Sequence, residues 1–318
     1  MRGRLPSAPG VLALLGLLVA GPAAGQDPWT ELSGANVRVR YQGSDSSRAA
    51  RALRVLERID LLPALGQVPE RPLLTIAPTR EVMDSLAGGR VPEWGAAVAL
   101  SERMEMVVPG RQLWPPSPVE EARILRHEWA HLALAQELGG LRIPRWFNEG
   151  YAEWSAGGWR GGGAWKLRVA LAMGGAPSLD SLALRWPAGR TPSEVAYLLS
   201  ASVIEYLVVS SGPRALEAFF HEWRETRSFD GAMRAVYGAT PAQLEADWRK
   251  WATRRYGWLM VVSHSAVFWA ILSGGLVSMA LIRQRYRRQQ MARLRAGEPP
   301  DSPAYWHEFQ EHQPQEEA

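Results

Sequence analysis

The chain has 318 residues, of which 47% are hydrophobic and 21% are charged. This composition provides a sizeable core and excludes general disorder. The absence of cysteine excludes disulfides, thiolate metal sites and cysteine nucleophiles, so a metal could be held only by His, Asp or Glu. The formal charge of +4 is uneven, because six arginines lie within residues 283–295 and six acids within 298–318. Residues 26–257 are left nearly neutral, which argues against a nucleic-acid partner.

The first 25 residues have the pattern of an export signal. Arg2 and Arg4 precede an apolar run over residues 11–20, and small residues follow at 23–25. A basic start, an apolar centre and a small-residue exit are typical of a signal peptide. We therefore expect residues 1–25 to be a signal peptide, with a buried helix as the alternative. Cleaved or retained, it places the rest of the body outside the cytoplasm.

A second apolar segment, residues 258–282, contains no Lys, Arg, Asp or Glu. About 20 apolar residues suffice to cross a bilayer, and arginines after such a segment fit a stop-transfer anchor. We expect one transmembrane helix here, in contact with membrane lipid, and a cytoplasmic tail over 283–318 that is basic, then acidic and disordered. Because Ser263, His264 and Ser265 are polar, a core helix is the alternative.

Residues 26–257 begin with strand patterns and continue with helical ones. Short apolar or alternating runs predict strands at residues 37–41, 73–77, 96–100 and 104–108. Helices are expected over residues 46–61 and near 80–86, and again within 192–255 with breaks near 211–213 and 238–241. The expected fold class is α+β, a small mixed sheet followed by a helical half.

One helix has clear start and stop signals. Ser117 is a helix cap, Pro118 takes the first helical position, and Glu120 stands three residues after the cap. Gly139 and Gly140 end the helix. The sequence thus predicts a helix between Ser117 and Gly139.

This helix carries an HExxH motif, His127-Glu128-Trp129-Ala130-His131. Residues four apart share one helix face, so His127 and His131 can reach one zinc ion while Glu128 faces the water that the ion activates. A second HE pair at His221 has no histidine four residues later. We interpret His221 as helix surface and His127 and His131 as metal ligands.

A catalytic zinc takes three protein ligands and keeps one position open. Glu149 lies in a further helical segment beyond the Gly139-Gly140 turn, and an antiparallel return would bring it beside the two histidines. Glu153, one turn later, can accept the outer ring N–H of a histidine ligand. The reverse assignment, with Glu153 on zinc and Glu149 outside, is the alternative.

These residues resemble a known family. His127 to His131, followed by Trp146-Phe147-Asn148-Glu149-Gly150-Tyr151-Ala152-Glu153, is similar to the gluzincin metallopeptidases, the thermolysin and aminopeptidase-N-like group, and particularly to their small peptidase MA-like members. The resemblance is specific over residues 95–155 and looser over 197–202 and 240–251. It implies a zincin-like fold in which Glu149 is the zinc ligand. The thermolysin pattern keeps aspartate where Glu153 stands, a departure that affects the surroundings of the ligands.

The resemblance also implies a mechanism. Zinc activates a water molecule, Glu128 accepts its proton and passes it to the leaving amine, and a Tyr or His of the helical half donates to the oxyanion. Tyr197 is the expected donor and Tyr151 a weaker one. An extended substrate could pair with the strand predicted at residues 104–108.

The sequence therefore predicts a single-pass, membrane-anchored zinc metallopeptidase that acts outside the cytoplasm on a peptide or protein substrate. Three alternatives remain open. The first is a catalytically retired zincin that serves as a binding or assembly module, which the intact Glu128 disfavours. The others are a zinc hydrolase of another bond, such as an amide of the envelope, and a structural membrane protein with an accidental motif.

Overall fold

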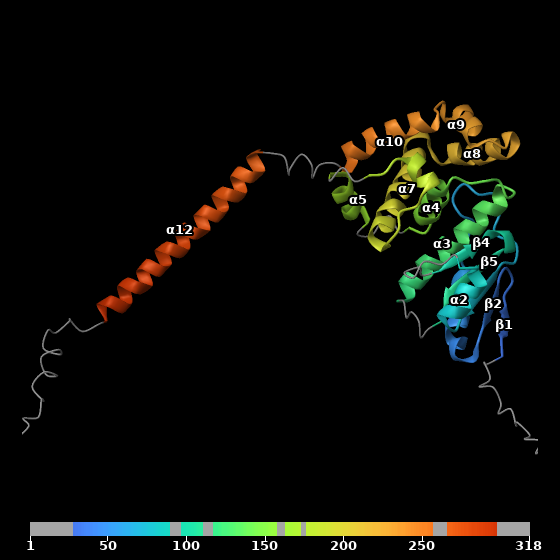
Figure 1. Cartoon of the computed structure of the whole chain (residues 1–318), viewed down its shortest axis with the longest axis horizontal. Helices are drawn as coiled ribbons and strands as arrows, with labels where there is room; N and C mark the ends of the chain where they lie inside the picture. Colours follow the sequence, from blue (N-terminus) through green and yellow to red (C-terminus); the bar gives the residue numbers. More distant parts are fainter. Residues whose placement is uncertain are drawn as a thin grey trace, which may run out of the picture.

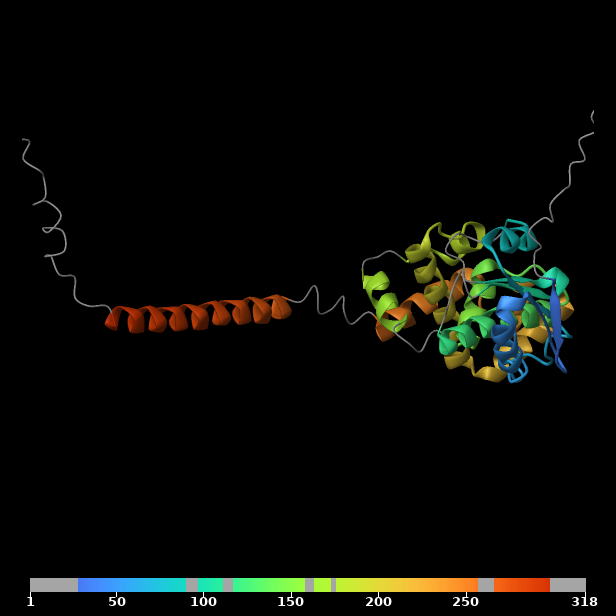
Figure 2. The same ribbon diagram turned by 90° about the horizontal axis from the view of Figure 1, so that it is seen from below.

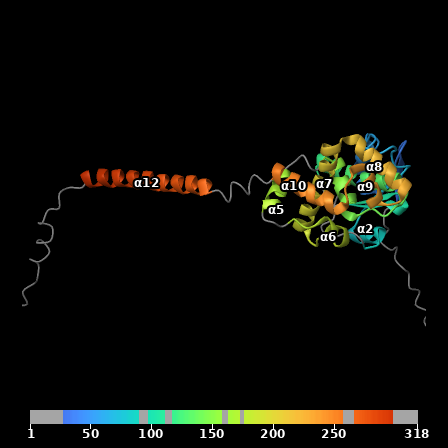
Figure 3. The same ribbon diagram turned by 90° about the horizontal axis from the view of Figure 1, so that it is seen from above.

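The computed structural model describes residues 28–89, 97–110, 117–157, 163–172, 176–256 and 266–297. A sheet with its helices packs against a helical half, and the long helix α12 (Ala266–Ala296) stands apart from both (Figure 1). The same separation is visible from below and from above (Figures 2 and 3). The predicted signal peptide, residues 258–265 of the predicted membrane span and the tail from residue 298 lie outside the described residues.

The sheet is mixed, as the sequence predicts. Its strand order is β1-β2-β3-β5-β4, and the strands are β1 (Thr30–Ser33), β2 (Arg38–Tyr41), β3 (Leu73–Ala77), β4 (Val98–Leu100) and β5 (Glu105–Pro109). β2, β3 and β5 run parallel, while β1 and β4 pair antiparallel with their neighbours. β3 and β5 are buried along their whole length, which explains why they are mostly apolar; their two polar side chains, Thr75 and Glu105, are hydrogen-bonded to each other at 2.8 Å. β1 was not predicted.

The place of β5 bears on substrate pairing. The strand predicted at residues 104–108 could have paired with substrate or have been an ordinary internal strand, and it is internal, because β5 is hydrogen-bonded to β3 on one side and to β4 on the other. An internal strand has no main-chain groups left for a peptide. Among the described strands, β4 is the edge strand on this side of the sheet.

Helices α1 (Ser46–Leu56), α2 (Arg80–Ala87) and α3 (Pro118–Glu137) contact the strands of the sheet. Short 3-10 turns lie at Gly43–Asp45 and Ser101–Arg103. The start of α3 follows the predicted signals, because the Ser117 side chain accepts the Glu120 backbone N–H at 3.2 Å. Its end does so too, since Gly139 and Gly140 have φ of 57° and 74°, a region that favours glycine.

Helices form the second half of the body. They are α4 (Arg145–Ser155), α5 (Gly163–Ala172), α6 (Leu179–Leu184), α7 (Arg190–Ser211), α8 (Pro213–Thr226), α9 (Phe229–Tyr237) and α10 (Pro241–Tyr256). The breaks at Gly212 and Gly238 were predicted, whereas the break between α8 and α9 was not. There Arg227 takes a positive φ of 52°, and no glycine or proline marks it in the sequence.

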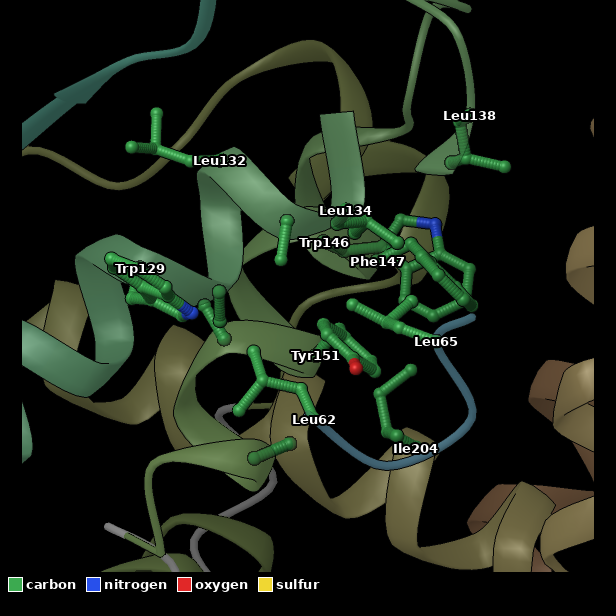
Figure 4. Packing of buried hydrophobic residues seen from close by; sticks show 14 of the residues in the cluster. Leu62, Leu65, Trp129, Leu132, Leu134, Leu138, Trp146, Phe147, Tyr151 and Ile204 are labelled. Carbon is green, nitrogen blue, oxygen red and sulfur yellow. The ribbon is translucent and has the colours of Figure 1, made fainter. Parts of the chain in front are cut away.

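The main core joins α3, α4 and α7. Trp129 of α3, Phe147 and Tyr151 of α4 and Ile204 of α7 are all buried and share one hydrophobic cluster, part of which is seen in Figure 4. Phe147 also meets Trp223 of α8 edge to face at 5.6 Å between ring centroids. Since close-packed side chains fix the helices that carry them, α3 and α4 are held rigidly relative to each other.

Gly150 explains how closely α4 approaches α7. A Cβ atom at Gly150 would lie 2.5 Å from the backbone oxygen of Ser200, closer than two such atoms can come. Helices that pack this tightly need a residue without a side chain at the contact. The glycine next to Glu149 therefore sets the position of the helix that carries this glutamate.

We expect Gly150→Ala to destabilise the protein by about 1–3 kcal/mol, the usual cost of overpacking a filled interior. The clash is with backbone, which cannot rotate away, so α4 must shift. Urea denaturation measures the change. Gly66→Ala is the matched control, because its Cβ would meet Glu137 at an ordinary 3.6 Å. Equal stability of the two variants would show that α4 and α7 have room to spare.

Two helices bear on the predicted membrane span. Within the described residues, α7 is the single helix that is long and apolar enough to cross a membrane, and 56% of its apolar window is buried inside the protein. Its packing on α4 makes it a core helix. α12 begins inside the predicted span, and its large apolar side chains, such as Ile271, Leu276 and Ile282, are exposed. The helix continues to Ala296, so residues 283–296, which were expected to begin a disordered tail, are helical instead. The first residues of the span lie outside the described part.

Candidate metal centre and catalytic cleft

α3 and α4 bring three predicted ligands together. His127 and His131 lie one turn apart on α3 with their Nε2 atoms 3.2 Å from each other. Glu149 of α4 places its Oε2 at 3.7 Å and 3.4 Å from these two nitrogens. In the described part of the chain, these residues form the one group of at least three potential ligands whose donor atoms all lie within 4.8 Å of one another.

Each histidine is fixed by an acceptor on its outer nitrogen. Glu153 Oε2 lies 3.3 Å from His127 Nδ1, and Asn148 Oδ1 lies 3.0 Å from His131 Nδ1. When neutral histidines donate through Nδ1, their Nε2 lone pairs face inward, which is the arrangement a metal ligand needs. The position of Glu153 was predicted from its helical spacing. Asn148 was not predicted, because nothing in the spacing of the motif indicates an amide beside His131.

Arg123 lies on α3 one turn before His127, and its side chain binds Glu153 of α4. Its guanidinium donates to both Glu153 oxygens, at 3.2 Å and 3.1 Å, and to Glu120 at 2.9 Å. Burial alone would raise the pKa of Glu153, but the hydrogen bonds from His127 and Arg123 outweigh it and lower the pKa. The partner of His127 is therefore a charged carboxylate. Nothing in the spacing of the motif indicated Arg123.

The electrostatics of the cluster favour a cation. Burial opposes a charge on His127, yet hydrogen bonds to Glu149 and Glu153 raise its pKa to about 10. Burial opposes the charge on Glu149 as well, but the two histidines hold the pKa of this carboxyl far below its usual range. Buried carboxylates thus require positive charge beside them. A zinc ion suits this donor set of two imidazole nitrogens and one carboxylate oxygen.

Glu128 lies between this cluster and the sheet. Its side chain is buried and lines the same cleft as the two histidines. Burial raises its pKa, although the neighbouring histidines and a backbone hydrogen bond with Ala99 of β4 act in the opposite direction. A carboxylate with a raised pKa is a stronger base. The position of the Glu128 carboxylate allows it to exchange a proton with a molecule that lies between the metal centre and β4.

The cleft has a volume of about 500 Å³. Its walls come from the edge strand, the two ligand helices and the segment before α7, and the lining residues include Ala97, Val98, Ala99, Ser101, Arg145, Trp186, Pro187, Ala188, Gly189 and Tyr197. The edge strand β4 thus borders the metal cluster. Trp186 and the segment after it were not predicted, because no motif marks them.

Tyr197 and Tyr151 lie in different surroundings. Tyr197 lines the cleft with its ring centroid 6.0 Å from that of His127. Burial and the nearby charges of Glu149 and Glu128 raise its pKa, so its hydroxyl stays protonated and can donate. Tyr151 is fully buried and donates to the Pro63 carbonyl at 2.7 Å. Figure 4 shows its ring among the core leucines. Tyr151 is therefore wrong as an oxyanion donor.

The second HE pair is confirmed as helix surface. His221 lies exposed on α8, whereas Trp223, two residues later, is buried in the core. No potential ligand group that includes His221 is found among the described residues. This contrast shows that the second histidine and the returning glutamate, rather than the HE pair alone, define the site.

Comparison with known proteins gives one family and several solved structures, while no curated protein matches. One structure is a two-domain M1 zinc metallopeptidase mutant bound to L-arginine, with 17% identity and a TM-score of 0.38 over 71% of this chain. Another is an M1 zinc metallopeptidase from Deinococcus radiodurans, with 17% identity and a TM-score of 0.32 over 70%. The chain spans about half the length of each, 51% and 50%.

The family match covers the elements that build the cleft. The sequence pattern of the Peptidase MA superfamily matches residues 91–254, just over half of the chain. This range includes β4, the ligand helices α3 and α4, and α7 with Tyr197. The chain therefore belongs to the Peptidase MA superfamily.

Proposed function

We propose that this protein is a zinc metallopeptidase that hydrolyses peptide bonds. The observation that carries the proposal is the convergence of His127, His131 and Glu149 beside a buried glutamate, Glu128, in a cleft bordered by an edge strand. Membership of the Peptidase MA superfamily supports it. A binding module derived from a peptidase would have no use for Glu128, which this chain retains.

In this mechanism His127, His131 and Glu149 hold the zinc ion. When bound, zinc supplies Lewis acidity, which acidifies a water molecule and polarises a carbonyl group. Glu128 accepts the proton of the attacking water and transfers it to the leaving amine. Tyr197 donates its hydroxyl proton in a hydrogen bond to the oxygen that becomes negative. β4, in place of β5, offers main-chain groups to an extended peptide.

The activity is tested with a peptide library and the purified full-length protein. Cleavage should stop when a chelator removes the zinc and return when zinc is added back. Zinc binding without cleavage of any peptide or protein would favour the alternative of a retired zincin that binds partners. Cleavage that persists in the chelator would exclude the proposed mechanism.

Replacing Tyr197 by phenylalanine is expected to lower kcat by about 10²–10³, the usual effect of losing one oxyanion donor. KM and zinc content should change little, because the ring and the ligands remain. Steady-state kinetics measures the effect. Tyr206→Phe on the same helix is the matched control, since Tyr206 packs against Trp251 rather than lining the cleft. A parent-like kcat for Tyr197→Phe would assign the donor elsewhere.

We further propose that residues 258–282 anchor the protein in a membrane, with residues 26–257 outside the cytoplasm. The segment is uncharged and arginines follow it. α12 supports this proposal because it continues from Ala266 through the arginine cluster as one helix with exposed apolar side chains. In water such a surface would be unfavourable, whereas lipid would cover it.

We expect protease added to intact cells, or to spheroplasts if an outer membrane is present, to digest the body and spare a tag placed after Ala318. The tag should be cleaved only when the membrane is opened. Cleavage of the tag with protection of the body would reverse the orientation. Recovery of the whole protein in the soluble fraction would exclude the anchor but leave the metal site unaffected.

A further inference from the structure

Arg145 supplies an unusual charge to the cleft. Among the described residues that line the cleft, it is the one arginine, and no lysine is present. Its side chain is 51% exposed, and its guanidinium lies over the Trp186 ring at 5.0 Å from the centroid. Stacking of this kind fixes the plane of a guanidinium while leaving its N–H edge free to bind another group.

Within the described structure the Arg145 guanidinium makes one ion-pair contact, with Glu149, and no side-chain hydrogen bond. Its nearest carboxylate oxygen is Glu149 Oε1 at 3.7 Å, beyond hydrogen-bond distance. The other oxygen of Glu149 is the one that faces the two histidines. Arg190, which begins the neighbouring helix α7, instead pairs with Glu194 at 3.4 Å. Arg145 therefore retains donors for a further acceptor.

Helix stability does not account for this arginine. Arg145 is the first residue of α4, where the helix dipole is positive and an acidic residue is favoured. The first turn of α4 contains no acid, and Pro144 before it gives no side-chain cap. The positive end of the helix and the guanidinium thus add their potentials at the same place, which suits a bound anion.

An aromatic row connects Arg145 with the metal centre. Trp186 lies 5.1 Å from Tyr197, ring centroid to ring centroid, and Tyr197 lies 6.0 Å from His127. The guanidinium is therefore on the same wall of the cleft as the proposed oxyanion donor. If the scissile carbonyl of a peptide lies at the metal centre, the substrate residue that reaches Arg145 is one close to the scissile bond.

We propose that Arg145 and Trp186 form a carboxylate-binding subsite, so that preferred substrates carry a carboxylate close to the scissile bond. The carboxylate comes either from an acidic side chain or from the free C-terminus of the peptide. A planar guanidinium binds a carboxylate through two parallel hydrogen bonds. That the ligand is a substrate rests on the proposed peptidase function. That Arg145 binds a carboxylate rests on the geometry of the cleft alone.

Binding is measured first, with zinc-loaded full-length protein carrying Glu128→Gln, so that no hydrolysis is needed. Three versions of one peptide are compared by calorimetry: a neutral amidated peptide, the same peptide with a free C-terminus, and an amidated peptide with one internal Gln changed to Glu. At least one carboxylate peptide should bind about 10-fold or more tightly than the neutral one, and which of the two does so identifies the source.

Adding Arg145→Gln should abolish this preference and leave binding of the neutral peptide within about twofold. Arg145→Lys should restore part of it, since lysine keeps the charge but not the paired donors. Arg142→Gln is the matched control, because Arg142 is exposed nearby but does not line the cleft. In the active parent, kcat/KM should follow the same order.

Equal binding of all three peptides by the Glu128→Gln protein with Arg145 intact would overturn the proposed subsite. So would equal losses on every peptide in Arg145→Gln, or loss of zinc from this variant, because Arg145 would then act by holding Glu149. The proposed function fails separately: carboxylate-dependent binding with no cleavage of any peptide would leave the subsite standing and remove the hydrolysis.

Discussion

Glu128→Gln is expected to lower kcat/KM by about 10²–10⁴, the range for loss of a positioned acid–base group. Glutamine has nearly the same shape, but it cannot accept a proton from water or return one to the leaving amine. Because Glu128 is buried beside β4, a neutral side chain there should not disturb the fold. Peptide cleavage by parent and variant at equal zinc content measures the effect.

The control is Glu222→Gln, which changes the glutamate of the second HE pair on the outer helix α8. It should keep parent-like activity, since it lies outside the cleft. A Glu128→Gln variant within about tenfold of the parent would remove Glu128 from the mechanism and direct attention to another base. Loss of zinc from the variant would show that Glu128 contributes to binding the metal.

His131→Ala is expected to weaken zinc binding by more than about 100-fold, the upper end of what loss of an outer hydrogen-bond partner costs. A site of three protein ligands that loses one retains only His127 and Glu149, and catalysis should vanish with the metal. Competition with a chromophoric chelator measures the affinity. His221→Ala, which removes an exposed histidine of α8, should change neither zinc binding nor cleavage.

A His131→Ala variant that binds zinc as tightly as the parent would place the metal elsewhere. If His131→Ala does not fold, zinc binding is measured instead in His131→Gln, which keeps a polar side chain of similar length. If the folded glutamine variant also bound zinc with parent affinity, the ligand role of His131 would be withdrawn.

Features that depend on residues close together in the sequence could be predicted from the sequence. Ser117, Pro118 and the two glycines at 139 and 140 set the ends of α3 locally, and the four-residue spacing of His127 and His131 follows from helix geometry. The return of α4 beside α3 follows from a short connection between two helices. The fold class and the middle of the sheet were predictable for the same reason.

Features that depend on packing could not be predicted. Asn148, Arg123 and Trp186 act through partners far away in the sequence, and no spacing rule links Trp186 to Arg145. The edge position of β4 depends on strand order, which alternation does not reveal, so the sequence left open whether residues 104–108 formed an internal strand or one that could pair with substrate. Tyr151 was considered for the cleft because it neighbours Glu149, whereas its helix face points into the core.

The zinc content and coordination of the purified full-length protein test the metal centre directly. Elemental analysis should give one zinc per chain, and X-ray absorption should give two imidazole nitrogens with oxygen ligands, one of which is lost in Glu149→Gln. A protein without zinc, or one in which Glu149→Gln and His127→Ala leave zinc content and coordination unchanged, would contradict the metal site on which the proposed mechanism depends.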